Sequence, residues 1–306
     1  IFFISEWLNS RMKPPPLLPG DTIGVMAPSS YVSQADIERS AARLAGLGYK
    51  IFIHPQTYAR QHQSAGTAAE KIAALTDLLK DPAVKAIWAA GGGNRALHLL
   101  EDLPYPLFRK HPKILIGFSD TTALLNAVYA KTGLITFHGP VFRQLADYEP
   151  LAQALETLRG AGAPIPLAGA TILRPGTARG RLIGGCLSIF QYLPGTDFMP
   201  KAKGAILFLE DTGDHVSRFD RMLLHLRRMK VFQNISALVV GEFTDLQEGS
   251  RPFGFSLREL VEEHLEHIDI PVVLDAPFGH GKNLPVFPVG AEVELCTSKG
   301  YIILRN

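Results

Sequence analysis

The sequence predicts an α/β protein of two domains, with a parallel sheet in the first. Short apolar runs alternate with segments of helical periodicity through residues 22–137, which is the pattern of parallel strands joined by helical crossovers. Prolines and glycines recur between residues 149 and 178, as in connections between domains. A chain of 306 residues with 46% hydrophobic content has room for two cores. The predicted division is an N-terminal α/β domain at 12–148, a linker at 149–178 and a C-terminal domain at 179–306.

The elements of the first domain follow from the change between apolar runs and helical periodicity. The short connections between them predict right-handed crossovers. Strands are expected at residues 22–26, 50–53, 84–89, 114–116 and 134–137. Helices are expected at residues 34–47, 67–79 and 95–100 and after residue 119.

The second domain alternates less regularly, so we expect its strand pairings to be more mixed. Strands are expected at residues 179–187, 205–209, 237–243, 272–274, 292–296 and 301–304. Helices are expected at residues 216–229 and 257–267.

Charge and composition exclude several classes of partner. The chain carries 31 basic and 29 acidic residues, a net charge of +2, without a long basic run or a stripe of basic and aromatic residues. Nucleic acids and anionic membranes are therefore not expected as partners, whereas a small molecule is. Cys186 and Cys296 lie far apart and match no metal or redox spacing, so we expect two reduced, buried thiols in a cytoplasmic protein.

The first eleven residues do not fit the predicted fold. Their apolar start at residues 1–4 is too short for a signal sequence and lacks a basic segment before it. Met12 begins a stretch that has the character of a natural start, so residues 1–11 are expected to be a non-native extension. No later segment reaches transmembrane length.

Ser119 stands where an apolar run ends and a helical segment begins, which predicts a strand, a sharp turn and a helix. Open α/β sheets bind ligands at the carboxyl ends of their strands, and the N–H groups of a helix start can receive negative charge. This geometry suits a nucleophile. The alternative is an ordinary helix cap, and Thr121 stands where the G-x-S-x-G motif has its second glycine.

Three consecutive glycines, Gly91, Gly92 and Gly93, follow the predicted strand at 84–89. Their backbone N–H groups could face an anion or supply oxyanion donors beside Ser119. The spacing is not that of a dinucleotide fingerprint and no P-loop lysine is present, so nucleotide binding is disfavoured. A tight turn that simply requires glycine remains the alternative.

The second domain offers an acid and a histidine that complement Ser119. Glu210 follows the apolar run at 205–209, and His280 lies between two glycines. A serine nucleophile needs a neighbouring base, and a histidine base needs an acid that fixes its tautomer. Spacing alone does not show that the three residues meet. His264 and His267 could share a helix face, but without an H-E-x-x-H pattern no metal site is expected.

These motifs together resemble the LD-carboxypeptidase family of serine peptidases, which includes the microcin C immunity peptidases. The resemblance covers nearly all of residues 13–306. It rests on residues 19–25, 27–30, 116–120, 132–140, 184–185, 208–211 and 277–280.

The resemblance implies a flavodoxin-like parallel-sheet domain at the N-terminus, a swivelling β/β/α domain at the C-terminus, and a homodimer without cofactor or metal. Both domains are expected to contribute to the active site. Ser119 would be the nucleophile, His280 the general base and then acid, and Glu210 the residue that orients the histidine. The oxyanion would be held by the backbone N–H of Asp120 with that of Gly91 or Gly92.

The expected activity is that of a cytoplasmic serine carboxypeptidase that releases terminal D-alanine from muropeptide tetrapeptides. Two alternatives are a hydrolase of a microcin C-type peptidyl nucleotide and a non-catalytic protein that binds a small anion at the glycines. The candidates for holding the terminal carboxylate are Arg95, Arg143 and Lys282.

Two positions depart from the common pattern of the family. Many members have an arginine before the glycines and Tyr-Gly after them, where this chain has Ala90 and Gly93-Asn94. Cys186 stands where an asparagine is common. We therefore expect differences in how the substrate is contacted.

Overall fold

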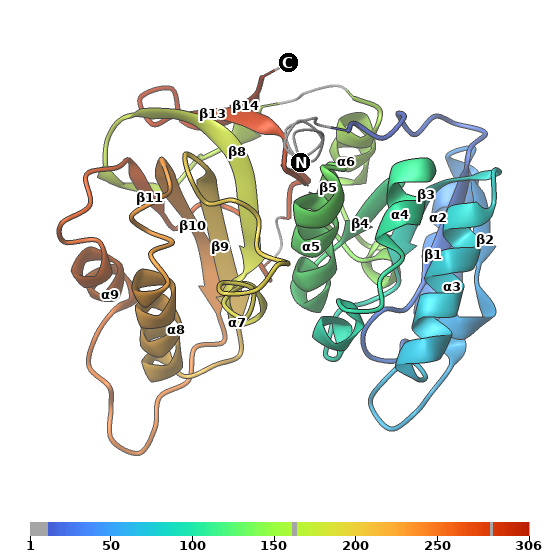
Figure 1. Cartoon of the computed structure of the whole chain (residues 1–306), viewed down its shortest axis with the longest axis horizontal. Helices are drawn as coiled ribbons and strands as arrows, with labels where there is room; N and C mark the ends of the chain where they lie inside the picture. Colours follow the sequence, from blue (N-terminus) through green and yellow to red (C-terminus); the bar gives the residue numbers. More distant parts are fainter. Residues whose placement is uncertain (1–11, 161–163, 282–283, 306) are drawn as a thin grey trace, which may run out of the picture. The chain divides into compact units, whose positions relative to one another are not determined.

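A computed structural model describes residues 12–160, 164–281 and 284–305. These residues form two compact units (Figure 1). The first unit contains the described residues up to 160 together with Pro285–Gly290, and the second contains the rest. The chain is a mixed α/β protein of two domains, as the sequence predicts. The expected extension at residues 1–11 lies outside the described residues.

The first unit is built on a six-stranded sheet with the order β12-β5-β4-β3-β1-β2. Its first five strands along the chain are parallel, and β12 pairs antiparallel with β5. The strands are β1 (Thr22–Met26), β2 (Lys50–Ile53), β3 (Val84–Ala89), β4 (Ile114–Gly117), β5 (Thr136–His138) and β12 (Phe287–Val289). The helices are α2 (Gln34–Gly46), α3 (Ala68–Lys80), α4 (Tyr105–Lys110), α5 (Thr122–Thr132) and α6 (Leu151–Leu158). Four short 3-10 helices complete it, η1 (Pro55–Tyr58), η2 (Ala96–Leu99), η3 (Ser119–Thr121) and η4 (Phe142–Gln144).

The central strands of this sheet explain why the sequence reads as a parallel sheet. Every residue of β4 is buried, and in β3 only Lys85 is exposed. Strands covered on both faces are continuous apolar runs rather than alternating ones. Helix α3 begins with a full capping box between Thr67 and Glu70, which fixes where it starts.

Three parts of the first unit differ from the sequence expectation. Within the expected helix at 95–100, only Ala96–Leu99 are helical, and they form the single 3-10 turn η2. Arg95 has a left-handed backbone (φ 89°), so a helix cannot include it. Helix α4 was not anticipated. Strand β12 was not anticipated either, and the sequence division placed its residues in the second domain; Pro288 weakens its local strand signal, and it forms an edge strand, where proline is tolerated.

The second unit is built on an eight-stranded sheet with the order β6-β14-β13-β8-β9-β10-β11-β7. The run from β8 to β11 is parallel and the outer pairings are antiparallel. The strands are β6 (Ile165–Pro166), β7 (Thr171–Arg174), β8 (Thr177–Cys186), β9 (Ile206–Thr212), β10 (Ala237–Thr244), β11 (Val272–Leu274), β13 (Glu292–Cys296) and β14 (Tyr301–Leu304). The helices are α7 (Leu187–Phe190), α8 (Val216–Arg228) and α9 (Leu257–His264).

Residues 149–178, which the sequence suggested as a linker, contain regular elements. Helix α6 belongs to the first unit, and β6 and β7 form the two edges of the second sheet. The prolines and glycines of this region therefore separate short elements from one another.

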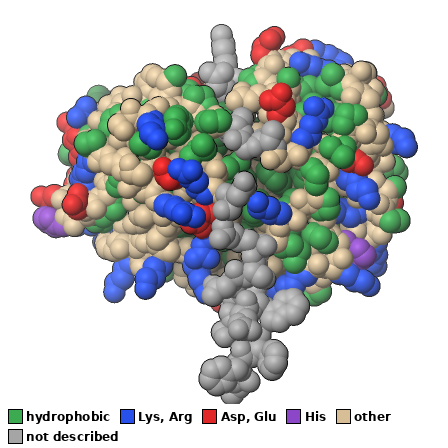
Figure 2. Space-filling view, turned by 90° about the horizontal axis from the view of Figure 1, so that it is seen from above, with side chains coloured by type: hydrophobic (Ala, Val, Ile, Leu, Met, Phe, Trp, Pro, Cys, Tyr) green, Lys and Arg blue, Asp and Glu red, His purple; other side chains and the backbone are tan. Residues whose placement is uncertain are grey.

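In the part of the chain that the structure describes, no helix has both the length and the apolar character needed to cross a membrane. Figure 2 shows basic and acidic side chains scattered over one face without a continuous basic stripe.

Candidate active site

Ser119 follows β4 after one intervening residue, Phe118, and opens the 3-10 helix that leads into α5. Its φ is 60°, in the left-handed region that residues other than glycine rarely adopt. The cap positions of η3 and α5 are Phe118 and Thr121, so Ser119 does not act as an ordinary helix cap. A strained serine between a strand and a helix is the arrangement that presents a nucleophile above an α/β sheet.

The glycine loop after β3 closely approaches this serine. A Cβ atom added to Gly92 would lie 2.9 Å from the Cβ and 3.3 Å from the Oγ of Ser119. Only glycine permits such an approach without a shift of one segment. The structure therefore brings together Ser119 and one of the predicted oxyanion donors within the first unit.

Asp120 turns its side chain into the protein rather than toward solvent. Only 2% of its surface is exposed, and its Oδ2 accepts a hydrogen bond of 2.8 Å from the N–H of Ala96. Burial raises the pKa of the Asp120 carboxyl, and its hydrogen bonds and the nearby Lys71 ammonium oppose this rise. The residue after Ser119 thus ties the Ser119 turn to the segment that follows the glycine loop.

One of the three candidate carboxylate-binding residues lies against the glycine loop. The N–H of Arg143 donates to the carbonyl of Ala90, and a Cβ added to Gly91 would lie 3.6 Å from Cδ and Nε of Arg143. Arg95 is exposed at the end of the loop. Lys282 lies outside the described residues.

The second unit brings the predicted acid and histidine together. Glu210 is completely buried in β9, and its Oε2 lies 2.7 Å from Nδ1 of His280. The His280 side chain is 18% exposed, so it connects the buried carboxylate with the surface of the unit. In the tautomer whose Nδ1–H donates a hydrogen bond to Glu210, Nε2 carries no hydrogen and can act as an acceptor.

The charge balance around this pair is set mainly by burial. Burial raises the pKa of Glu210, while the hydrogen bond and the positive charge of His280 lower it. Asp211 and Glu242 raise it further. A buried carboxylate that is hydrogen-bonded to an imidazole holds the ring in place.

Asp211, the neighbour of Glu210, has a different role in the structure. It accepts hydrogen bonds from the N–H groups of Ser188 (2.6 Å) and Thr212 (2.8 Å) and from the hydroxyl of Ser188 (3.2 Å). These bonds attach the start of α7 to the end of β9. Asp211 is therefore occupied mainly by donors at the start of α7, whereas Glu210 pairs with the histidine.

Glu242 is an acidic residue near the histidine that the sequence analysis did not single out. It lies in β10, and a Cβ added to Gly281 would come 1.8 Å from its Oε2, so its carboxylate lies against the backbone beside His280. Its N–H donates a hydrogen bond of 2.7 Å to the carbonyl of Phe278, which holds β10 beside the segment that carries His280. An acidic residue within a predicted strand after the apolar run 237–241 was the available signal.

The two cysteines fit the sequence expectation of reduced, buried thiols. Cys186 and Cys296 are free and buried, and burial raises the pKa of the Cys186 thiol well above its ordinary value. Among the residues that the structure describes, no group of histidines, cysteines and carboxylates could hold a metal.

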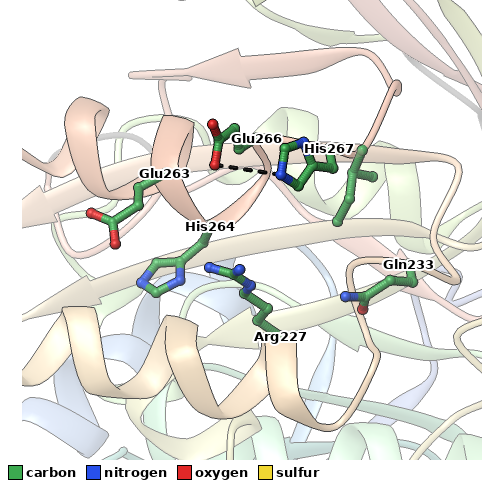
Figure 3. Close-up of a pocket in the computed structure, with 7 residues that line it drawn as sticks. Arg227, Gln233, Glu263, His264, Glu266 and His267 are labelled. Atoms are coloured by element: carbon green, nitrogen blue, oxygen red, sulfur yellow. Dashed lines mark ion pairs between the residues drawn. The ribbon is translucent and has the colours of Figure 1, made fainter.

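His264 and His267 line a small pocket of about 140 Å³ in the second unit (Figure 3). His264 Nε2 lies 2.9 Å from Asp220, whereas His267 Nε2 lies 3.7 Å from Glu266. The two rings thus take separate carboxylate partners instead of facing a common ligand.

Known proteins share both halves of this architecture. A family model for the LD-carboxypeptidase N-terminal domain matches residues 23–139, and a model for the LD-carboxypeptidase C-terminal domain matches residues 179–295. The two matches contain Ser119 in the first and Glu210 and His280 in the second.

Individual relatives span almost the whole chain. A "Putative carboxypeptidase" of Synechocystis is 34% identical, covering 95% of this chain and 97% of the relative. The "Probable murein peptide carboxypeptidase" of Bacillus subtilis is 31% identical, covering 96% and 94%. The solved structure of the microcin C7 self-immunity protein MccF in complex with aspartyl sulfamoyl adenosine has a TM-score of 0.87 and 26% identity, covering 96% of this chain and 98% of that one. This chain belongs to the LD-carboxypeptidase family.

Proposed function

We propose that this protein is a serine carboxypeptidase that releases D-alanine from murein tetrapeptides. The bond cleaved joins the L-centre of meso-diaminopimelate to the terminal D-alanine. The observation that carries the proposal is the left-handed Ser119 turn packed against Gly92, together with the buried Glu210 carboxylate at 2.7 Å from His280. The similarity to a murein peptide carboxypeptidase supports the class of substrate.

The proposed mechanism assigns one step to each group. The Oγ of Ser119 attacks the scissile carbonyl carbon while Nε2 of His280 takes the hydroxyl proton. The oxyanion accepts hydrogen bonds from the backbone N–H of Asp120 and from that of Gly91 or Gly92. His280 then gives the proton to the nitrogen of D-alanine, which leaves, and water hydrolyses the acyl-enzyme by the same route. Glu210 stabilises the imidazolium throughout.

The proposal includes the setting of the enzyme. It acts in the cytoplasm on peptides of wall turnover, as a homodimer, and needs neither metal nor cofactor. Incubation with a chelator should leave the activity unchanged. Inactivation by the chelator, with recovery when zinc is added, would show that a metal and not Ser119 carries the reaction.

The stereochemistry of the released amino acid tests the substrate. The tetrapeptide L-Ala-γ-D-Glu-meso-diaminopimelate-D-Ala should release D-alanine, and the same peptide ending in L-alanine should release little. A mismatched isomer that leaves a buried polar group unpaired costs about 1–3 kcal/mol, or about ten- to a hundredfold in rate. Chiral analysis of the liberated alanine gives the answer, with the Ser119→Ala variant as the blank. Equal release of both isomers would refute the LD specificity.

A second candidate is hydrolysis of a microcin C-type peptidyl nucleotide, which the similarity to MccF bound to aspartyl sulfamoyl adenosine favours. The two candidates share the mechanism and differ in the leaving group. A competition between the tetrapeptide and an aspartyl adenylate separates them, since a strong preference for the adenylate would select the second. Failure of a fluorophosphonate to label Ser119, combined with no turnover of either substrate, would support a non-catalytic protein that binds an anion at Gly91–Gly93.

A further inference from the structure

Lys71 on helix α3 is a buried cation that the proposed mechanism does not use. Only 1% of its surface is exposed. Its Nζ donates hydrogen bonds of 2.8 Å to the carbonyl of Ser29 and 2.8 Å to the hydroxyl of Ser64. A buried ammonium is costly unless such acceptors surround it, so its presence at this position requires an explanation.

The peptide bond between Ser29 and Ser30 joins the acceptor of Lys71 to a residue that contacts the glycine loop. The N–H of Ser30 donates to the carbonyl of Gly92 (3.3 Å), and the hydroxyl of Ser30 accepts from the N–H of Asn94 (3.2 Å). Ser30 therefore holds the loop on both sides of Gly93, whose φ of 116° brings it against the Ser30 side chain. Because Lys71 fixes Ser29, it fixes the residue that positions Gly92 beside Ser119.

The charged groups that influence Lys71 lie in the Ser119 turn and at the end of the glycine loop. Burial lowers the pKa of Lys71 to about 8, Asp120 from the nucleophile turn raises it, and Arg95 from the end of the glycine loop lowers it. Its neighbour Glu70 is engaged in the capping box with Thr67. The ammonium is thus influenced by the carboxylate that follows Ser119 and by the arginine at the end of the glycine loop.

A second buried lysine in the first unit provides a comparison. Lys113 is 6% exposed and donates to the carbonyls of Leu78 (2.8 Å) and Asp81. Burial lowers its pKa to about 8 as well. Lys113 lies immediately before β4, whereas Ser119 follows β4. Lys113 is therefore also a buried ammonium bound by carbonyls, but it lies at the opposite end of the strand from Ser119.

We propose that Lys71 is a positioning residue whose ammonium holds the Ser29–Ser30 segment, and through it the Gly91–Gly93 loop, in register with Ser119. It touches no substrate. The inference rests on the proposed function, because it assumes that the glycine loop serves the reaction at Ser119. Loss of the charge weakens the bonds to Ser29 and Ser64, since charge-assisted hydrogen bonds are roughly twice as strong as neutral ones.

The test compares Lys71→Met and Lys71→Arg with the matched control Lys113→Met. Lys71→Met should lower kcat on the order of 10²-fold with little change in KM, because misplaced oxyanion donors act on the transition state. Wild-type kcat should fall as the pH rises through about 8. Lys71→Arg, whose charge does not titrate in this range, should keep most of the activity and lose this alkaline fall. Lys113→Met should keep both the rate and the fall.

Hydrogen–deuterium exchange gives a readout that does not depend on turnover. At pH 7, Lys71→Met should exchange faster in peptides that cover residues 28–32 and 90–95, and Lys113→Met should not. Unchanged exchange there, or an alkaline fall that persists in Lys71→Arg, overturns the inference. Absence of turnover in the wild type would refute the proposed function instead, and the exchange result would still decide the role of Lys71. If Lys71→Met does not fold, the exchange and pH profile of Lys71→Arg against the wild type decide it.

Discussion

The two units hold the proposed catalytic residues by different physical means. The first unit uses backbone geometry: Ser119 sits at φ 60° and Gly92 approaches it so closely that no Cβ fits between them. The second unit uses charge: Glu210 is completely buried, and its Oε2 lies 2.7 Å from Nδ1 of His280. The first part should therefore be sensitive to added atoms, and the second to a lost charge at constant shape.

The largest effect is expected where the geometry presents the reacting atom. Ser119→Ala removes the Oγ and keeps the Cβ, so the fold and the left-handed turn can remain. The rate should fall by roughly 10⁶, as when other serine hydrolases lose their nucleophile. Steady-state kinetics and thermal unfolding of the purified variant measure both properties. A variant that retains a tenth of the wild-type rate would exclude Ser119 as the nucleophile.

The next effect tests the charge of the second unit without changing its shape. Glu210→Gln keeps the size of the side chain but loses the negative charge that stabilises the His280 cation, so kcat should fall by up to about 10⁴. Asp211→Asn is the matched control, because Asp211 accepts backbone N–H bonds at the start of α7. It should cost stability, about 1–3 kcal/mol, more than rate. If Asp211→Asn lowers kcat more than Glu210→Gln, the orienting role belongs to Asp211.

A smaller effect tests the close approach in the first unit. Gly92→Ala places a Cβ 2.9 Å from that of Ser119, so the loop must move away from the nucleophile. The rate should fall by about 10² to 10³, the loss that follows removal of one oxyanion donor. Gly46→Ala is the control, since a Cβ there meets nothing within 4 Å. Equal kcat in both variants would show that the approach of Gly92 has no part in the reaction.

The comparison of the two units also explains what the sequence revealed. The Ser119 turn is encoded by neighbouring residues, an apolar run followed by helical periodicity, so it could be located from the sequence. Lys71 reads instead as one more polar residue in an amphipathic helix. Its burial depends on Ser29 and Ser64 meeting it in three dimensions, which no local pattern records.

The same reasoning applies to the second unit and to the division of the chain. Glu210 and His280 each stand out in the sequence, one at the end of an apolar run and the other between two glycines. They lie 70 residues apart, so only the resemblance to a family indicated that they form a pair. Glu242 lies near the backbone beside His280 because its N–H pairs with the carbonyl of Phe278, which is distant in the sequence. Strand β12 is three residues long and contains a proline, so its return to the first sheet follows from long-range pairing with β5. Long-range pairings of this kind are what a single sequence conceals.

The smallest expected effect sharpens the contrast between activity and stability in the first unit. The pKa of Lys71 is about 8 in the fold and 10.5 in its ordinary state. Between these values the unfolded chain binds a proton at this residue and the folded chain does not, so the free energy of unfolding should rise with pH, by at most about 1.4 kcal/mol per pH unit. The measurement is urea unfolding of the wild type minus that of Lys71→Met at pH 8 and pH 9, which cancels the titration of other groups. The free energy of unfolding of the wild type minus that of Lys113→Met should rise in the same way, because the pKa of Lys113 is lowered as well.

If Lys71 only maintained the fold, activity would follow stability. We expect instead that kcat falls over the pH range in which the contribution of Lys71 to stability increases. A decrease of both with pH would show that the alkaline loss of activity is unfolding.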